Sequence, residues 1–126
     1  MILGIGIDLC AVARMENSLQ KPAFAARVFA PQEQAFWQDF SDKRRAESAA
    51  AAFAAKEAFL KAAGTGLREP FSLCEIEAIR QENGAPAYRF SGKTAEWVQA
   101  RSLTARLSLS HEGGMALAFC TLETET

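Results

Sequence analysis

One long run of helix-forming residues limits what this chain can fold into. Ser41 is a suitable N-cap, alanines dominate the residues that follow, and Gly64 is the type of residue that commonly lies just past a helix end. The sequence therefore predicts a helix from about Asp42 to Ala63. Its second half is apolar on nearly all sides, so this helix should be buried in the middle of the domain.

The other segments alternate between strand-like and helix-like patterns. We expect strands over residues 2–8, 73–80, 87–90, 105–111 and 115–122, and further helices over 11–20, over 22–29, from 30 onward, and from 91 or 92 to 101. Turn-forming residues separate the second strand from the third and the fourth from the fifth, which indicates two hairpins. The order predicts one α+β domain over 1–122, a mostly antiparallel sheet packed against a long central helix, followed by a short tail over 123–126.

Composition excludes several classes of function. The 126 residues include 14 Lys and Arg against 15 Asp and Glu, so no bulk positive charge favours nucleic acid. The apolar N-terminal segment is too short to cross a bilayer and lacks the pattern of a signal peptide. Cys10, Cys74 and Cys120 are widely spaced and fit neither a disulfide framework nor a zinc site. We expect a soluble, cytoplasmic protein with no nucleic-acid or membrane partner.

Two acids, Asp8 and Glu57, are the candidate metal ligands. Asp8 closes the first strand, in which Gly4 and Gly6 leave room for a ligand or a neighbouring backbone. Glu57 lies in the apolar part of the long helix, where a charge needs a partner. Together they can hold one hard divalent cation with positions open for substrate phosphates. The alternatives are a turn-forming role for Asp8 and a solvated ion pair with Lys61 for Glu57.

Basic residues in the same segments indicate an anionic substrate. Lys61 follows Glu57 by one helical turn and shares its face. His111 ends a strand-like segment beside a glycine turn, where it has either a structural role or a place at the lip of a pocket. A short basic run, Lys43-Arg44-Arg45, stands at the start of the long helix; it forms either a solvated face or a site where a bound phosphate offsets its unfavourable place on the helix dipole. The pattern predicts a metal-assisted site that handles phosphates.

Taken together, these segments resemble the phosphopantetheinyl transferases of the holo-acyl-carrier-protein synthase type. The matching segments are Gly4–Asp8 with Arg14, Phe53–Lys61 followed by Gly64–Gly66, Asn83–Pro86, and Ser108–His111. They cover nearly the whole chain in the family's order, and the lysine–glutamate–alanine block is the most specific of them. The resemblance implies an enzyme of fatty acid biosynthesis that transfers phosphopantetheine from coenzyme A to a serine of apo acyl carrier protein, releasing adenosine bisphosphate.

The same resemblance implies roles for individual residues. Asp8 and Glu57 correspond to the ligands of Mg²⁺, and Glu57, Lys61 and His111 correspond to catalytic residues beside the phosphates. Substrate binding is implied for Lys43, Arg44, Lys61, Gly64, Gly66 and His111. Breaking a diphosphate depends mostly on alignment and charge neutralisation, which these residue types supply. The base for the serine proton stays open among Glu57, His111 and a water on the metal.

The resemblance also implies two protein partners. The first is the chain itself, which is implied to form a homotrimer with active sites at the subunit interfaces. The other is an acidic acyl carrier protein, for which a basic docking surface is suitable. The candidate docking residues are Arg14, Lys21 and Arg27. The chain departs from the family pattern at Ala52, where Arg is frequent, and at Pro22 and Ala23, where some relatives carry further positive charge.

Two other functions fit the same motifs. A non-catalytic module could bind coenzyme A or a carrier protein, although the complete set of Asp8, Glu57, Lys61 and His111 argues against lost chemistry. A metal-dependent enzyme could act on a different nucleotide diphosphate. A ligand that binds the folded protein raises its melting temperature, so comparing coenzyme A with simpler nucleotides separates the last possibility from the first.

Overall fold

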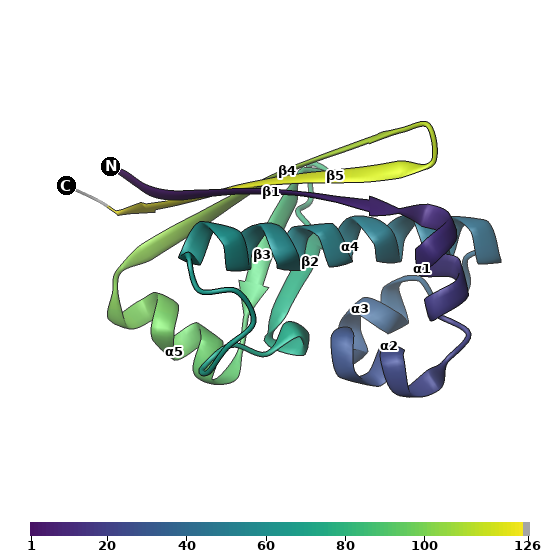
Figure 1. Cartoon of the computed structure of the whole chain (residues 1–126), viewed down its shortest axis with the longest axis horizontal. Coiled ribbons are helices and arrows are strands. Elements are labelled where there is room, and N and C mark those ends of the chain that lie inside the picture. The colour runs from purple at the N-terminus through teal and green to yellow at the C-terminus, as the bar shows by residue number, and fades with distance from the viewer. Residues whose placement is uncertain (125–126) are drawn as a thin grey trace.

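A three-stranded antiparallel sheet lies over one long helix in the computed structural model, which describes residues 1–124 (Figure 1). The elements in chain order are β1 (Ile2–Ala11), α1 (Val12–Ser18), α2 (Pro22–Val28), α3 (Pro31–Phe36), α4 (Asp42–Ala63), the 3-10 turn η1 (Leu73–Glu75), β2 (Ile76–Arg80), β3 (Pro86–Phe90), α5 (Gly92–Ala100), β4 (Leu103–Glu112) and β5 (Met115–Thr124). The sheet has the order β1-β5-β4, while β2 and β3 form a separate hairpin. Helices α1, α2 and α3 gather near the start of α4 (Figure 1). The predicted α+β class is confirmed.

The central helix α4 forms where the sequence predicts it. The backbone N–H of Arg44 donates to the Ser41 hydroxyl at 3.2 Å, which caps the N-terminus. At the other end Gly64 adopts a left-handed φ of 81°, and its N–H donates to the carbonyl oxygens of Leu60 and Lys61. Twelve of the helix residues are buried, so α4 is the axis around which the other elements pack.

Strand β1 lies directly on α4 because two of its inward-facing residues have no side chain. A Cβ at Gly4 would collide with the backbone oxygen of Ala62, and one at Gly6 with the backbone oxygen of Ala58. Side chains alternate along a strand, so Asp8 faces the same way as these glycines. The close contact therefore brings Asp8 to the side of α4.

We expect Gly6→Ala to lower the free energy of unfolding by at least about 2 kcal/mol, because the new methyl group meets backbone that cannot rotate away. Gly84→Asn is a matched control. Gly84 has a φ of 87° and open space around it, and Asn tolerates that conformation, so the expected change is within about 0.5 kcal/mol. Urea unfolding followed by circular dichroism measures both. A Gly6→Ala protein as stable as the wild type would contradict the close packing of β1 on α4.

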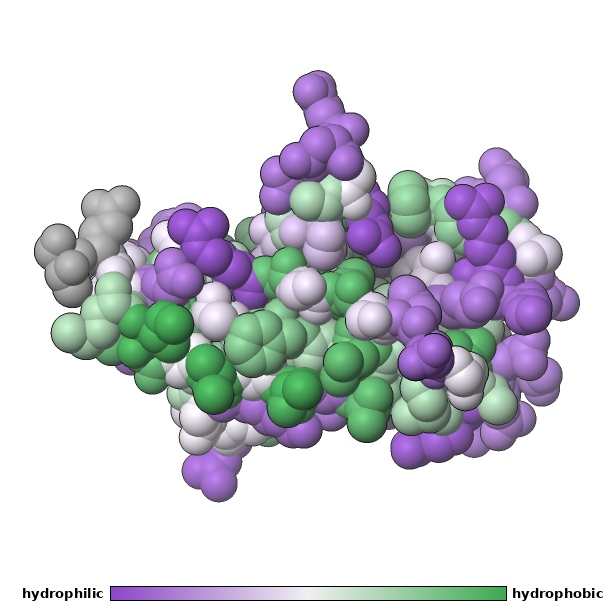
Figure 2. Space-filling view, turned by 90° about the horizontal axis from the view of Figure 1, so that it is seen from above, coloured by the Kyte–Doolittle hydropathy of each residue, from purple (hydrophilic) through white to green (hydrophobic). Residues whose placement is uncertain are grey.

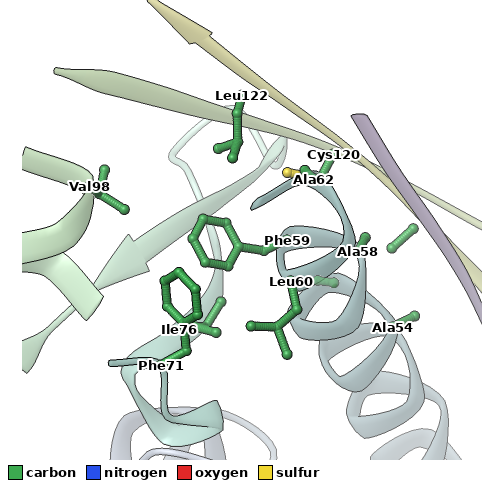
Figure 3. Close-up of a cluster of buried hydrophobic side chains, with 12 residues drawn as sticks. Ala54, Ala58, Phe59, Leu60, Ala62, Phe71, Ile76, Val98, Cys120 and Leu122 are labelled. Atoms are coloured by element: carbon green, nitrogen blue, oxygen red, sulfur yellow. The ribbon is translucent and has the colours of Figure 1, made fainter. Parts of the chain in front are cut away.

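Two clusters of buried side chains cover the two halves of α4. Phe59 is at the centre of the first, with its ring centroid 5.6 Å from that of Phe71 (Figure 3). The ring of Phe90 also packs on it, at 4.8 Å between centroids. The second cluster lies near the N-terminal half of the helix and contains Phe29 and Trp37, whose rings meet edge to face at 5.0 Å. Such contacts fix α4 against the hairpin on one side and the short helices on the other.

Two of the predicted strand boundaries are wrong, namely the end of the first strand and the start of the second. β1 does not end at Asp8, because its residues continue to pair with β5 as far as Ala11. Residues 73–75 form η1 instead of the start of a strand: the backbone N–H of Ile76 donates to the carbonyl of Leu73, which also accepts from Lys56 Nζ at 2.9 Å. The other elements begin and end within two residues of their expected bounds.

The C-terminal boundary also differs from the prediction. Glu123 and Thr124 belong to β5, although the sequence assigns them to the tail. The reason is that Thr124 and Met1 exchange hydrogen bonds between their backbones, which holds the two ends of the chain together. Residues 125 and 126 lie outside the described residues. Within the part of the chain that the structure describes, no helix is long and apolar enough to cross a membrane.

Candidate functional site

Three of the predicted site residues meet on the flank of α4 that faces β1. Lys61 Nζ donates to Asp8 Oδ1 at 3.1 Å and to the backbone oxygen of Ile7 at 2.9 Å. Glu57 lies one turn before Lys61 on the same helix face, and the charges of both Asp8 and Lys61 act on its carboxyl group. An acid from the first strand thus meets an acid and a lysine from the central helix, as the sequence predicts.

The electrostatics of this group favour a bound cation. Partial burial of Glu57 and, second, the nearby carboxylate of Asp8 raise the pKa of Glu57, while Lys61 opposes this rise. In the free chain Lys61, whose side chain is 55% exposed, supplies the positive charge beside Asp8. The carboxylates of Asp8 and Glu57 therefore repel each other in a position that water only partly reaches. A cation bound between them would relieve this repulsion.

The donor set suits a hard ion that shares its coordination with a ligand. Among residues 1–124, no group of three or more His, Cys, Asp or Glu side chains could hold a metal ion. Mg²⁺ needs no such group, because it is usually bound by one or two carboxylates together with waters and substrate phosphates. Asp8 and Glu57 fit this pattern, and they do not fit a closed zinc site.

A second set of predicted residues lines a cavity on another flank of α4. The cavity has a volume of about 440 Å³, and its walls come from α3, the first half of α4, the β2–β3 hairpin and the end of β4. Arg44 and His111 both line it. The guanidinium of Arg44 lies over the ring of Phe40, 3.8 Å from its centroid, which holds this charge in place at the start of α4.

The charged residues of the cavity favour an anionic ligand. Glu33 and Glu77 in its wall are neutralised by ion pairs with Lys56 at 2.7 Å and Arg89 at 3.0 Å. The remaining ionised side chains of the wall are Arg44, Arg80 and Glu47. The two arginines outnumber the one acid.

These two sets of residues are not brought together within one chain. Ala52, in the cavity wall, precedes Glu57 by five residues, which corresponds to a turn of about 140° around the helix. Asp8 lies on β1 and His111 on β4, which are the two edge strands of the sheet, with β5 between them. The predicted group of Glu57, Lys61 and His111 is therefore split over two flanks of α4.

The remaining predicted residues lie near one or the other set. Lys43 is exposed beside Arg44. Gly64 and Gly66 follow the end of α4 that carries Lys61, adopt positive φ, and have no atom within 4 Å of a Cβ position, so the backbone there is open to a ligand. The basic residues proposed for docking are all exposed, on α1, just before α2 and on α2: Arg14, Lys21 and Arg27. The first of these residues, Arg14, lies on α1, which directly follows the strand that carries Asp8.

Sequence reasoning missed Glu33. Its side chain is almost fully buried, and its carboxylate accepts a hydrogen bond from Lys56 Nζ at 2.7 Å. The only signal in the sequence is Lys56 itself, because a lysine on a helix that is apolar all round needs a buried acid. Which acid supplies that partner depends on how α3 packs, and no local pattern reveals it.

Comparison with known proteins identifies the family. Residues 4–120 match the model of the 4'-phosphopantetheinyl transferase superfamily. A holo-[acyl-carrier-protein] synthase of Trichlorobacter lovleyi is 42% identical in an alignment 126 positions long that covers 98% of each chain. The crystal structure of such a synthase from Bacillus anthracis in complex with CoA (3',5'-ADP) has a TM-score of 0.85 at 33% identity and 99% coverage of both chains. The Helicobacter pylori synthase in complex with coenzyme A has a TM-score of 0.79 at 29% identity, covering 94% of this chain and 99% of that one.

The chain therefore belongs to the 4'-phosphopantetheinyl transferase superfamily. Within it, the similarity extends over the whole length of the holo-[acyl-carrier-protein] synthases. The predicted family, the enzyme class and the transfer of phosphopantetheine from coenzyme A to apo acyl carrier protein are confirmed at this level. The roles of individual residues stay predictions.

Proposed function

We propose that the chain carries out this transfer with Asp8 and Glu57 holding Mg²⁺ beside the diphosphate of coenzyme A. The observation that carries the proposal is the convergence of Asp8, Glu57 and Lys61 on one flank of α4. Bound there, the ion would neutralise negative charge that develops on the phosphate oxygens. Two of the similar structures contain coenzyme A or part of it, which supports a site for this ligand.

The side chains of the site have separate tasks in this proposal. The carrier serine oxygen forms a bond to the phosphorus that bears the pantetheine arm, the bond from that phosphorus to adenosine bisphosphate breaks, and the serine proton passes to a base. Lys61 turns from Asp8 to the phosphates and balances the charge on the leaving group. Glu57 and His111, one from each flank, are the side chains able to accept the serine proton.

We further propose a homotrimer, in which a second copy of the chain covers the outer face of the sheet. On β1 the outward-facing residues are apolar and between 55% and 62% exposed: Leu3, Ile5, Ile7 and Leu9. Phe119 of β5 lies opposite Ile7 and is 40% exposed. Figure 2 shows hydrophobic residues gathered on this face. An apolar sheet face of this kind is typical of a contact between subunits.

The geometry of the sheet supports active sites shared between subunits. Asp8 lies on one edge strand, β1, and His111 on the other, β4, so a head-to-tail ring that packs through the outer face can bring the β1 flank of each subunit to the β4 flank of its neighbour. Glu57 and Lys61 of one subunit would then face Arg44 and His111 of the next. In this arrangement Arg44, with Lys43 beside it, binds the ribose phosphate, and the backbone at Gly64 and Gly66 closes the other side.

We assign the carrier protein to the surface of α1 and α2. Arg14, Lys21 and Arg27 are exposed there and would attract an acidic partner. The surface starts directly after the strand that carries Asp8, so a carrier docked on it presents its serine to the metal side of the site. The protein contains three free cysteines, which fits the reducing cytoplasm as its location.

Intact-mass spectrometry of a carrier protein tests this function. The chain, apo carrier, coenzyme A and Mg²⁺ are incubated together, and the carrier should gain the mass of one phosphopantetheine arm. A chelator should stop the reaction, and added Mg²⁺ should restore it. A chain that is stabilised against heat by coenzyme A but never changes the carrier's mass would be a binding module instead. Stabilisation by simpler nucleotide diphosphates alone would indicate a different substrate.

A further inference from the structure

A buried ion pair between α3 and α4 has no assigned role in the proposed reaction. The side chains of Lys56 and Glu33 are 0% and 2% exposed, and Lys56 Nζ lies 2.7 Å from Glu33 Oε1. Lys56 directly precedes Glu57 on α4, and Glu33 lines the cavity that contains Arg44 and His111. The pair therefore lies between the two sets of candidate residues.

The pair ties four segments of backbone together. Lys56 Nζ also donates to the carbonyl oxygens of Leu73 at 2.9 Å and Ile76 at 2.6 Å, which belong to η1 and the start of β2. Glu33 accepts from the backbone N–H of Ala30 at 3.0 Å and of Ala78 at 3.2 Å. The three protons of the ammonium all have acceptors, so Lys56 has no proton left to donate to a substrate.

Stability alone does not account for these two charges. Burial lowers the pKa of Lys56 and raises that of Glu33, because each charge has left water, and their attraction offsets only part of this. Buried ion pairs can often be replaced by uncharged residues of similar volume without loss of stability. What an apolar pair does not supply is the set of directed hydrogen bonds to η1, β2 and α3. These bonds fix where the cavity wall lies relative to α4.

We propose that Lys56 and Glu33 are positioning residues, which hold the cavity wall formed by α3 and β2 against the helix that carries Glu57. Ala78, whose N–H is bound by Glu33, is itself part of that wall. The inference rests on the proposed function in one respect, namely that the cavity receives the nucleotide end of coenzyme A. The pair then affects how tightly coenzyme A is bound, while the carboxylates of Asp8 and Glu57 keep their geometry.

The test compares a charge-free double variant with a control that is only destabilised. Lys56→Met with Glu33→Gln removes both charges and leaves no lone buried ion. We expect the KM for coenzyme A to rise about tenfold with kcat changed less than about threefold, the signature of lost binding and not of lost chemistry. The control is Val98→Ala, in the core cluster around Phe59. It should lower the melting temperature without changing the KM for coenzyme A.

One further variant and two further measurements keep the result interpretable. Glu33→Gln alone leaves Lys56 with its two carbonyl acceptors but without a buried counter-charge, so it should lower the melting temperature more than the double variant and shift KM in the same direction. Amide hydrogen exchange at Ala30 and Ala78 should speed up in both variants, and Mn²⁺ affinity should match the wild type. A folded double variant with the wild-type KM and exchange rates would overturn the positioning role. A wild-type chain that never modifies the carrier would instead contradict the proposed function.

Discussion

Asp8→Asn and Glu57→Gln are each expected to slow carrier modification by on the order of a thousandfold, with the fold and the assembly preserved. Each substitution keeps the shape of the side chain and removes one of the two carboxylates that converge beside Lys61. Initial rates in the mass assay at high Mg²⁺ measure the effect. Glu96→Gln, at an exposed position on α5, is the matched control and should keep the wild-type rate.

Stability should respond in the opposite sense to activity in Glu57→Gln. The pKa of Glu57 is raised in the folded protein, so as the pH falls the folded state takes up this proton before the unfolded state does. The destabilisation caused by the charge is present above the raised pKa and is relieved as the pH falls through it. With a chelator present at neutral pH, the melting temperature of Glu57→Gln should therefore be equal to or above that of the wild type.

Mg²⁺ then separates a metal site from a general loss of structure. The ion should raise the melting temperature of the wild type and have a smaller effect on either variant, because one ligand is missing. Wild-type rates in Asp8→Asn or Glu57→Gln would remove the metal site from the mechanism. A loss of activity that parallels a loss of thermal stability would show that the carboxylates act through the fold.

The centre of the fold could be predicted because its signals are local. The caps at Ser41 and Gly64 and the alanines between them depend only on neighbouring residues, so the bounds of α4 are correct. The sequence also indicates that something lies close to the strand that carries Asp8, because Gly4 and Gly6 have no side chains. The structure shows that the close neighbour is α4, the helix that carries Glu57. The convergence of the two acids follows directly from that packing.

Other features depend on surfaces that no local pattern reveals. In β1 the glycines face the protein and the isoleucines face outward, the reverse of the usual order, because the backbone of α4 fills the space on the inner side. Ile5 and Ile7 therefore look like core residues in the sequence and are exposed in the chain. The partner of Lys56 is equally hidden, since Glu33 comes close only through the packing of α3.

Two inactive variants should restore activity when their subunits are mixed in one trimer. Each active site is expected to consist of two half-sites: the group Asp8, Glu57 and Lys61 beside β1, and the cavity with Arg44 and His111. Glu57→Gln damages the first half-site, and Arg44→Ala with His111→Ala damages the second. If each active site combines one half from each of two neighbours, random mixing leaves about a quarter of the sites with both halves intact. The unfractionated mixture should therefore recover up to about a quarter of the wild-type rate, and mixed trimers freed of homotrimers up to about a third, from parents that are both nearly inactive.

The design of the mixture provides its own control. Asp8→Asn and Glu57→Gln lie in the same half-site, so trimers mixed from these two variants should stay as inactive as their parents. Two affinity tags, one on each variant, allow mixed trimers to be purified after co-expression, and light scattering confirms their size. Recovery in the first mixture and none in the second is the pattern that shared sites require.

The outer face of the sheet links this result to assembly. Ile7→Lys places a charge in the middle of the exposed apolar face, where burial against another subunit would cost several kcal/mol. We expect this variant to be monomeric and inactive, although Asp8, Glu57 and Lys61 remain in place, because the cavity with Arg44 and His111 of the same chain lies on the other flank of α4. A monomeric Ile7→Lys protein with wild-type activity, or no recovery in the first mixture, would mean that one chain builds the whole site by itself.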